Sequence, residues 1–252
     1  MIGDHLTDNG FLDGRVNILQ PKTGYRAATD PVFLAATVNA RAGETVLELG
    51  CGAGVAMACL LHRVPVLATG LELQQEYADL AVQNMDRNGF AAEIIVGDLS
   101  EMPTRLREKS FDHVMMNPPF YESSRHSAPF DEGKTTAFLE GEVRLEAWIS
   151  TGMKRLKPLG WLTIIHRVER LPHILQALEK AGDIRILPLS ARAGREAGRV
   201  LVQARKGSGG PLRLLAPLVL HTGETHQKDV DDFSSTAREI LRDGNALVIT
   251  RR

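Results

Sequence analysis

The chain is poor in cysteine and lacks long apolar segments. Its 252 residues include two cysteines, Cys51 and Cys59, and their separation matches no zinc-binding spacing. Scarce cysteine is typical of a reducing compartment. No apolar run approaches the length of a membrane span, and the polar start of the chain does not resemble a secretory signal. We therefore expect a cytoplasmic protein that binds neither a metal nor a membrane.

A strong charge of one sign is also absent. The formal net charge is −1, so any binding to nucleic acid must come from a local basic patch. A hydrophobic content of 43% is enough for a full core. The length favours one domain over 1–252, with an N-terminal extension to about residue 40 and a C-terminal appendage from about residue 207.

The central pattern is an apolar stretch, 46–49, that runs directly into Gly50, Gly52 and Gly54. The apolar run predicts a buried strand, and the glycines permit a tight turn that passes close to a ligand. An apolar helix start over 55–61 completes the first half of a Rossmann-like unit. A dinucleotide-binding loop requires G-x-G-x-x-G, and this spacing differs because the third glycine comes too early.

The pattern E-x-G-x-G-x-G, which begins at Glu48, resembles motif I of class I S-adenosylmethionine (SAM) methyltransferases. The next predicted strand ends in Glu72, 22 residues after Gly50, close to where a ribose-binding acid is expected. We expect Glu72 to accept hydrogen bonds from both ribose hydroxyls. Glu48 is expected to hold the methionine amino group or to order the turn. Asp98 is expected to accept from the adenine amino group; alternatively, it caps the following turn.

Thr29 and Asp30 precede Pro31 at a predicted helix start, where either side chain can cap the helix. Capping alone is one interpretation of this pair, and contact with the cofactor is the other. The complete set of expected SAM-binding residues is Thr29, Asp30, Glu48, Gly50, Gly52, Gly54, Glu72, Leu73, Asp98, Leu99 and Asn117.

Strand and helix patterns alternate from residue 45 onward. The expected strands are 45–48, 66–72, 93–96, 111–116, 161–166, 183–189 and 199–204, and the expected helices include 74–88, 137–156, 171–180 and 231–242. This alternation predicts an α/β fold with a Rossmann-like, doubly wound, mostly parallel, seven-stranded sheet. The ends of the first four strands would then meet at one crevice, where such sheets bind ligands.

A second motif, Asn117-Pro118-Pro119-Phe120, directly follows a predicted buried strand. It resembles the (N/D/S)-P-P-(Y/F/W) motif of methyltransferases that act on amino groups attached to planar π systems. The side-chain oxygen of Asn117 and the carbonyl of Pro118 can accept the amino protons, which favours a pyramidal nitrogen with an available lone pair. The prolines fix the backbone, and Phe120 offers a stacking face for a ring. These four residues are the expected catalytic set; alternatively, the segment is an ordinary turn.

Basic residues are concentrated between 185 and 213, around a glycine-bearing loop. The candidate stripe consists of Arg185, Arg192, Arg195, Arg199, Arg205, Lys206 and Arg213. Such a stripe fits a phosphate backbone, and the alternative is a solvated charged face.

The motifs together resemble the bacterial tRNA1(Val) (adenine-37-N6)-methyltransferase family. The resemblance is carried by Gly24-Tyr25-Arg26, Thr29-Asp30, Glu48 to Gly54, Gly70-Leu71-Glu72, Gly97-Asp98, Asn117 to Phe120, Leu162 to Arg167 and Ala204 to Gly207. It implies SAM as cofactor, tRNA as partner and N6-methylation of an adenine. Family members often carry Tyr where this chain has Phe120, a change that preserves stacking but loses a hydroxyl.

Other functions remain compatible with the same motifs. The amino-nitrogen motif also serves enzymes that methylate a protein glutamine amide or another nucleic-acid amino group. A non-catalytic SAM-binding RNA-interaction protein is an alternative of another class, although the intact Asn117 argues against it. The stretch 121–136 has no periodicity, so we expect a lid over a flipped-out adenine, with a plain surface loop as the alternative. His62, His113, His166 and His221 are scattered and are expected to be core or surface residues.

Overall fold

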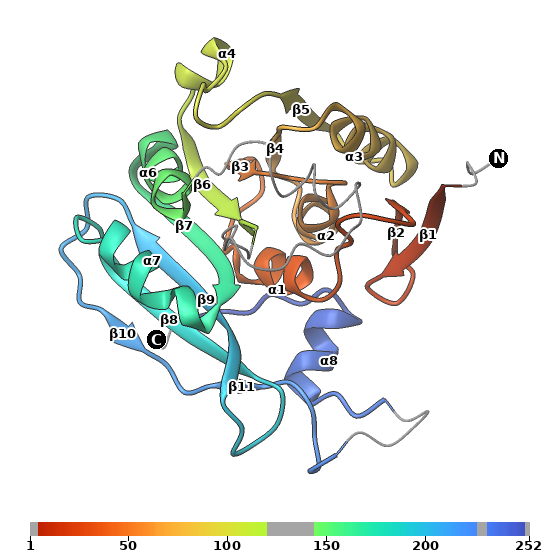
Figure 1. Ribbon diagram of the computed structural model, residues 1–252, viewed down its shortest axis with the longest axis vertical. Coiled ribbons are helices and arrows are strands. Elements are labelled where there is room, and N and C mark those ends of the chain that lie inside the picture. Colours follow the sequence, from red (N-terminus) through yellow and green to blue (C-terminus); the bar gives the residue numbers. More distant parts are fainter. Residues whose placement is uncertain (1–4, 120–143, 226–230, 250–252) are drawn as a thin grey trace, which may run out of the picture.

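The computed structural model of the protein describes residues 5–119, 144–225 and 231–249, and it shows a twisted sheet with helices on both faces (Figure 1). Phe120 and the expected lid over 121–136 lie outside the described residues. The main sheet runs, in spatial order, through β10 (Arg213–Leu214), β8 (Gly182–Ser190), β9 (Ala197–Arg205), β7 (Leu156–Arg167), β6 (Phe111–Met116), β3 (Thr45–Leu49), β4 (Leu67–Glu72) and β5 (Ala92–Val96), and β11 (Leu218–Val219) also pairs with β8.

The strand directions confirm the Rossmann-like, doubly wound prediction. The five strands from β5 to β7 are all parallel, and β9 is antiparallel to both of its neighbours. The expected count of seven is wrong for the described sheet, which has nine strands. The two additional strands are only two residues long, and they form because the appendage lies along the outer edge of β8. Sequence periodicity cannot reveal such short strands, since pairing alone defines them.

Helices cover the two faces of the sheet through two separate apolar clusters. The helices are α1 (Asp30–Thr37), α2 (Val55–Arg63), α3 (Gln75–Arg87), α4 (Thr104–Arg107), α6 (Leu145–Arg155), the 3-10 turn η1 (Val168–Arg170), α7 (Leu171–Ala177) and α8 (Ser235–Leu241). Successive side chains of a strand point to opposite faces, so Val114 and Met116 pack with α6 and α7 while Met115 packs with α1 and α2. In the described part of the chain, no helix is long and apolar enough to cross a membrane.

Two expected boundaries differ from the structure. The turn expected at 158–160 lies inside β7, because Leu159 donates to the Lys206 carbonyl and Lys206 donates to the Gly160 carbonyl, which extends the pairing with β9. The helix expected over 137–156 is described from Leu145 to Arg155, and residues 137–143 lie outside the described part.

The N-terminal extension forms a hairpin, β1 (Leu6–Phe11) and β2 (Val16–Pro21), that is fastened to the glycine turn. The buried amide of Asn84 on α3 exchanges hydrogen bonds with Leu19, accepting from its N–H at 2.8 Å and donating to its carbonyl at 3.0 Å. The same side chain donates to the carbonyl of Ala53 at 2.9 Å. One buried amide therefore joins the extension, α3 and the turn that follows β3.

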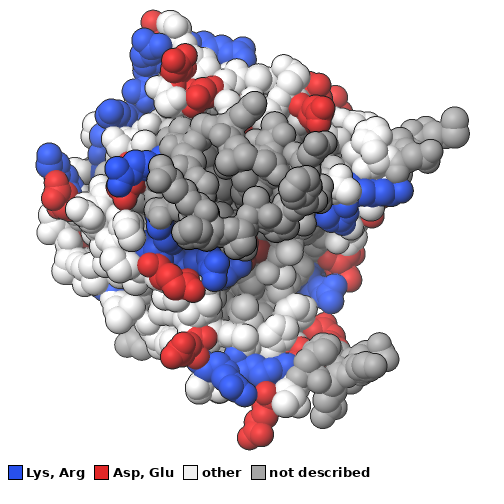
Figure 2. Space-filling view, viewed as in Figure 1, with Lys and Arg blue, Asp and Glu red and all other residues white. Residues whose placement is uncertain are grey.

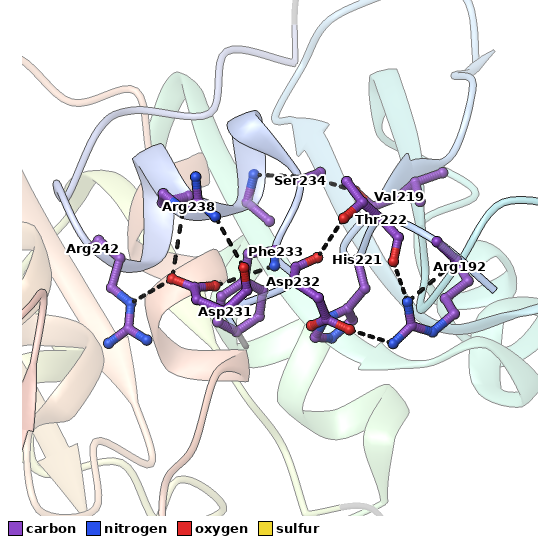
Figure 3. A network of polar contacts seen from close by, with 12 residues as sticks. Arg192, Val219, His221, Thr222, Asp231, Asp232, Phe233, Ser234, Arg238 and Arg242 are labelled. Carbon is purple, nitrogen blue, oxygen red and sulfur yellow. Dashed lines mark hydrogen bonds and ion pairs between the residues drawn. The ribbon is translucent and has the colours of Figure 1, made fainter. Parts of the chain in front are cut away.

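The C-terminal appendage is held by a polar network (Figure 3). Asp232 pairs with Arg192 through one carboxylate oxygen and with the Nδ1 atom of His221 at 2.7 Å through the other. Ser234 caps α8 by accepting from the N–H of Ala237 at 3.2 Å. These contacts join the loop after β8 to the segment before α8.

We expect Asp232→Ala to lower the free energy of unfolding by about 3 kcal/mol, because the Arg192 guanidinium would stay largely buried without its carboxylate. The two side chains are 12% and 13% exposed. The matched control is Asp243→Ala, whose pair with Arg15 is 52% and 46% exposed and should contribute less than about 1 kcal/mol. Thermal unfolding of the two variants should separate them, and equal losses would contradict a special role for the network.

Candidate active site

A pocket lies at the carboxyl ends of β3 and β6, where the sequence predicted a ligand crevice. Four expected site residues line it together: Glu48, Gly50, Gly52 and Asn117. The described lining also includes Gln20, Tyr25 and Tyr77, which the sequence analysis did not select as site residues. The only signal for Tyr25 was its place in the stretch Gly24 to Arg26 that carries the family resemblance.

The turn after β3 needs its glycines for two different reasons. All three have positive φ, which favours glycine. A side chain at Gly50 would begin 2.6 Å from the ring of Trp148, and one at Gly54 would begin 2.9 Å from the end of Met85. At Gly52 the nearest atom would be a ring carbon of Tyr25 at 4.0 Å. The absence of a side chain therefore makes room for Trp148 at Gly50 and for Met85 at Gly54, whereas at Gly52 it leaves space on the pocket side.

Glu72 orders this turn from the neighbouring strand. One carboxylate oxygen accepts from the N–H of Gly52 at 2.8 Å, and the other accepts from the N–H of Gln74 at 3.0 Å. The side chain is buried. Each oxygen has a further lone pair, so the carboxylate can hold the turn and still accept from a ligand hydroxyl.

Glu48 is less well hydrogen-bonded than Glu72 within the described structure. It is 3% exposed, and its Oε2 atom has no hydrogen-bond partner among the described residues. Burial, together with the nearby charge of Glu72, raises the pKa of Glu48 well above its usual range, although the backbone of Met57 opposes the shift. A buried carboxylate in this state has a strong preference for a cationic partner, such as a ligand ammonium group.

Asn117 presents an unsatisfied acceptor to the same pocket. Its Nδ2 atom donates to the Tyr25 hydroxyl at 3.2 Å, while its buried Oδ1 atom has no partner in the described part of the chain. Tyr77 donates to the backbone carbonyl of Tyr25 at 3.1 Å and so fixes the segment that carries this phenol. Desolvation and the carboxylates of Asp30 and Glu48 raise the pKa of Tyr25 to about 12, so the phenol stays protonated at neutral pH.

Other expected site residues have different surroundings. Thr29 is exposed and makes no side-chain cap to α1 within the described chain, so capping by Thr29 is wrong. Asp30 instead accepts from the Nε atom of Arg199 at 2.8 Å, an ion pair that links α1 to β9.

Three expected cofactor residues, Leu73, Asp98 and Leu99, follow β4 and β5 and are not among the described residues that line the pocket. Leu73 is 48% exposed, and Leu99 is buried in the core. Asp98 accepts from the N–H of Ser100 at 2.7 Å, as the turn-capping alternative predicted. Pro118 is buried and Pro119 is exposed at the end of β6.

The candidate basic stripe is divided between the two ends of β9. Arg199 lies beside the carboxyl end of β7, near the pocket, whereas Arg205 lies opposite Trp161 at the far edge. Six steps along a strand span about 20 Å. At the far edge, the guanidinium carbons of Arg185 and Arg205 lie 4.2 and 5.4 Å from the ring centre of Trp161.

Acidic side chains neutralise part of this set. Arg192 pairs with Asp232, Arg199 with Asp30, and Arg205 with Asp183. Lys206 donates to the Leu156 carbonyl at 2.6 Å, while Arg195 and Arg213 are exposed. Figure 2 shows basic and acidic side chains interspersed over the visible face rather than one continuous basic surface.

The chain is similar to several characterised groups. Residues 29–178 match the family described as methyltransferase small domain. Proteins named tRNA1(Val) (adenine(37)-N6)-methyltransferase are 26% identical in Shewanella halifaxensis, over 66% of this chain and 67% of the relative, and 31% identical in Porphyromonas gingivalis, over 62% of this chain and 64% of the relative. The alignment with the Porphyromonas gingivalis protein therefore spans less than two thirds of the length of that protein.

Solved structures show the same fold. A protein of Agrobacterium tumefaciens described as a predicted O-methyltransferase is 26% identical, with a TM-score of 0.68, over 86% of this chain and 97% of its own. A 16S rRNA N2 methyltransferase of T. thermophilus, solved with AdoMet and guanosine, is 18% identical with a TM-score of 0.54, over 80% of this chain and 50% of its own. These findings confirm the expected SAM-dependent N-methyltransferase and its cofactor. The family match covers more than half of this chain, and the chain therefore belongs to the methyltransferase small-domain family.

Proposed function

We propose that the protein transfers the methyl group of SAM to the N6 amino group of an adenine in tRNA. The observation that carries this proposal is the buried, unpartnered Oδ1 atom of Asn117 in the pocket that also contains Glu48. An acceptor without a donor at this place suits a ligand that brings N–H groups. Adenine N6 supplies two such groups on a nitrogen attached to a π system.

The residues of the pocket fit SAM. Glu48 would hold the ammonium group of the methionine part, because its carboxylate is buried and lacks a partner on Oε2 in the described structure. Glu72 would accept from ribose hydroxyls while it continues to order the turn. Asp98 and Leu99, which follow β5, are proposed to contact the adenine. When bound, the cofactor supplies an electrophilic methyl group on a sulfonium.

The acceptor amine requires orientation rather than a strong base. Asn117 Oδ1 and the Pro118 carbonyl would accept the two amino protons, so the nitrogen lone pair points toward the methyl group. Positioning of this kind supplies a large part of the rate of an in-line displacement. Phe120 is proposed to stack on the adenine ring.

tRNA as the substrate is supported by the names of the relatives and by basic side chains near the motif. Arg167, Arg170 and Arg199 come from the carboxyl end of β7, the turn after it and the start of β9. Cations here would contact phosphates that flank a flipped-out nucleotide. Arg185, Arg205 and Arg213 at the far edge are proposed to contact a more distant part of the same RNA.

The first prediction concerns Glu48 and the cofactor. Since the raised pKa of Glu48 disfavours its anion, SAM should bind more tightly as pH rises and this carboxyl ionises against the ligand ammonium. Glu48→Gln should weaken the binding of SAM by about tenfold and remove the part of the pH dependence that comes from the ionisation of Glu48. Calorimetry between pH 6 and 8.5, compared between the two proteins, measures both effects. Tight binding of NAD without binding of SAM would overturn the assignment of the glycine turn.

The second prediction separates the acceptor site from the cofactor site. Asn117→Ala should reduce methyl transfer by about 100-fold or more while the Kd for SAM changes less than about threefold. Glu72→Ala should instead raise the Kd for SAM, because it removes ribose acceptors and frees the N–H of Gly52. Single-turnover rates and calorimetry on both variants test this division. The same profile for both variants would refute it.

The substrate itself is tested in cells. A strain without this protein should lose N6-methyladenosine from a tRNA, as measured by mass spectrometry of digested tRNA, and the active protein should restore it. Restoration by Asn117→Ala would favour the non-catalytic binding protein. Unchanged tRNA with loss of methylglutamine from a protein, or of another modified base, would point to the alternative acceptors.

A further inference from the structure

His166 lies directly beside the Asn-Pro-Pro motif, although its position in the sequence gave no sign of this. The side chain is 1% exposed at the end of β7. Strands β6 and β7 are parallel, with Met116 opposite Ile164. The residues that follow Met116 therefore run alongside the end of β7, and this brings Pro119 to the ring of His166.

Two backbone groups determine which ring nitrogen carries the proton. The N–H of Arg167 can only donate, and it donates to Nδ1 of His166 at 2.8 Å. The ring also hydrogen-bonds to the backbone of Pro119, and because proline has no N–H, the partner must be its carbonyl. Nδ1 is therefore an acceptor, and Nε2 carries the proton that is donated to Pro119.

The ring stays neutral at physiological pH. Burial, followed by the positive charges of Arg170 and Arg199, lowers the pKa of His166 to about 4. Asp30 faces the same region, but it is paired with Arg199. Protonation of Nδ1 would break its bond with the N–H of Arg167, so the bridge requires the neutral form.

The motif needs a donor of this kind because of its own composition. Two consecutive prolines lack N–H groups, so they cannot continue the hydrogen-bond ladder of β6 along β7. Their φ angles are fixed, and Pro119 also restricts the ψ angle of Pro118, so the ψ angle of Pro119 is the freedom that remains. A bond to the Pro119 carbonyl restrains this remaining freedom just after the two acceptors, Asn117 Oδ1 and the Pro118 carbonyl.

We propose that His166 is a positioning residue for methyl transfer, which fastens the Pro119 carbonyl to the end of β7 and thereby aims the acceptors of Asn117 and Pro118 at the substrate amine. This inference rests on the proposed function. His166 does not act as the base, because Nδ1 is occupied by the N–H of Arg167 and the residue is not among the described residues that line the pocket.

The rate experiment compares three variants. His166→Leu should lower the single-turnover rate of tRNA methylation by about 10- to 100-fold, while the Kd for SAM stays within about threefold of the wild type. His166→Gln, whose amide can still donate to the carbonyl, should recover most of the rate. The matched control is His113→Gln, which changes a buried histidine in the amino-terminal half of β6, opposite Val46, and should leave the rate unchanged.

The outcomes distinguish positioning from other roles. A His166→Leu variant that methylates at the wild-type rate would overturn the proposal, as would a loss of rate that only parallels a loss of SAM binding. If the rate of the wild-type protein changed around pH 6.5 and this change disappeared in the His166 variants, His166 would instead act as a base. If His166→Leu does not fold, as judged by its thermal transition, His166→Asn, which places no donor at the position of Nε2, replaces it as the variant expected to lose the rate, and His166→Gln remains the rescue variant.

A second readout does not depend on activity. Long-range 1H–15N spectra of histidine rings should show His166 with its proton on Nε2, unchanged from pH 8 to pH 5. A proton on Nδ1, or titration near pH 6.5, would contradict the bridge. If the wild-type protein binds SAM but does not methylate tRNA, the proposed function fails, and the spectra still decide whether His166 fastens the motif.

Discussion

The site depends on the hydrogen bond between Glu72 and the N–H of Gly52. This single contact ties the turn after β3 to the end of β4. Around it, Gly50 is packed against Trp148 and Gly54 against α3, so the turn has little room to move. The buried amide of Asn84 then joins the same turn to the N-terminal hairpin. The segment with Tyr25, which reaches Asn117, is thereby placed relative to the glycine turn.

Two buried acids close to one pocket reduce the stability of the empty protein. Burial, together with repulsion from Glu72, raises the pKa of Glu48, and its Oε2 atom lacks a hydrogen bond within the described structure. Such an arrangement is unfavourable for folding alone but favourable for binding a cation, because the ligand supplies the missing partner. The unpartnered oxygen of Asn117 follows the same principle on the acceptor side. The pocket therefore contains polar atoms that a ligand can hydrogen-bond when it binds.

Sequence patterns were sufficient where local chemistry decides the structure. Apolar runs located the main strands, and the spacing of Gly50, Gly52 and Gly54 indicated the turn. They failed where contacts come from distant parts of the chain. Thr29 does not cap α1, and the two-residue strands exist only because β8 offers them an edge.

The basic residues and His166 illustrate the same limit. A cluster in the sequence predicted one stripe, but Arg199 and Arg205 lie six residues apart along the extended strand β9 and so reach its two opposite ends. His166 was expected to be an ordinary core or surface residue, and it is indeed buried. Its contact with Pro119 could not be foreseen, since it depends on the register between β6 and β7.

The short strands β10 and β11 also have a consequence for solubility. An uncovered edge of β8 would present free N–H and C=O groups to a second molecule, and exposed edges of this kind promote aggregation. The pairing of residues 213–214 and 218–219 with β8 covers two parts of that edge, and Leu215 donates to the Ile186 carbonyl between them. The appendage therefore protects this edge of the sheet from pairing with a second molecule. The network around Asp232 holds the appendage in place.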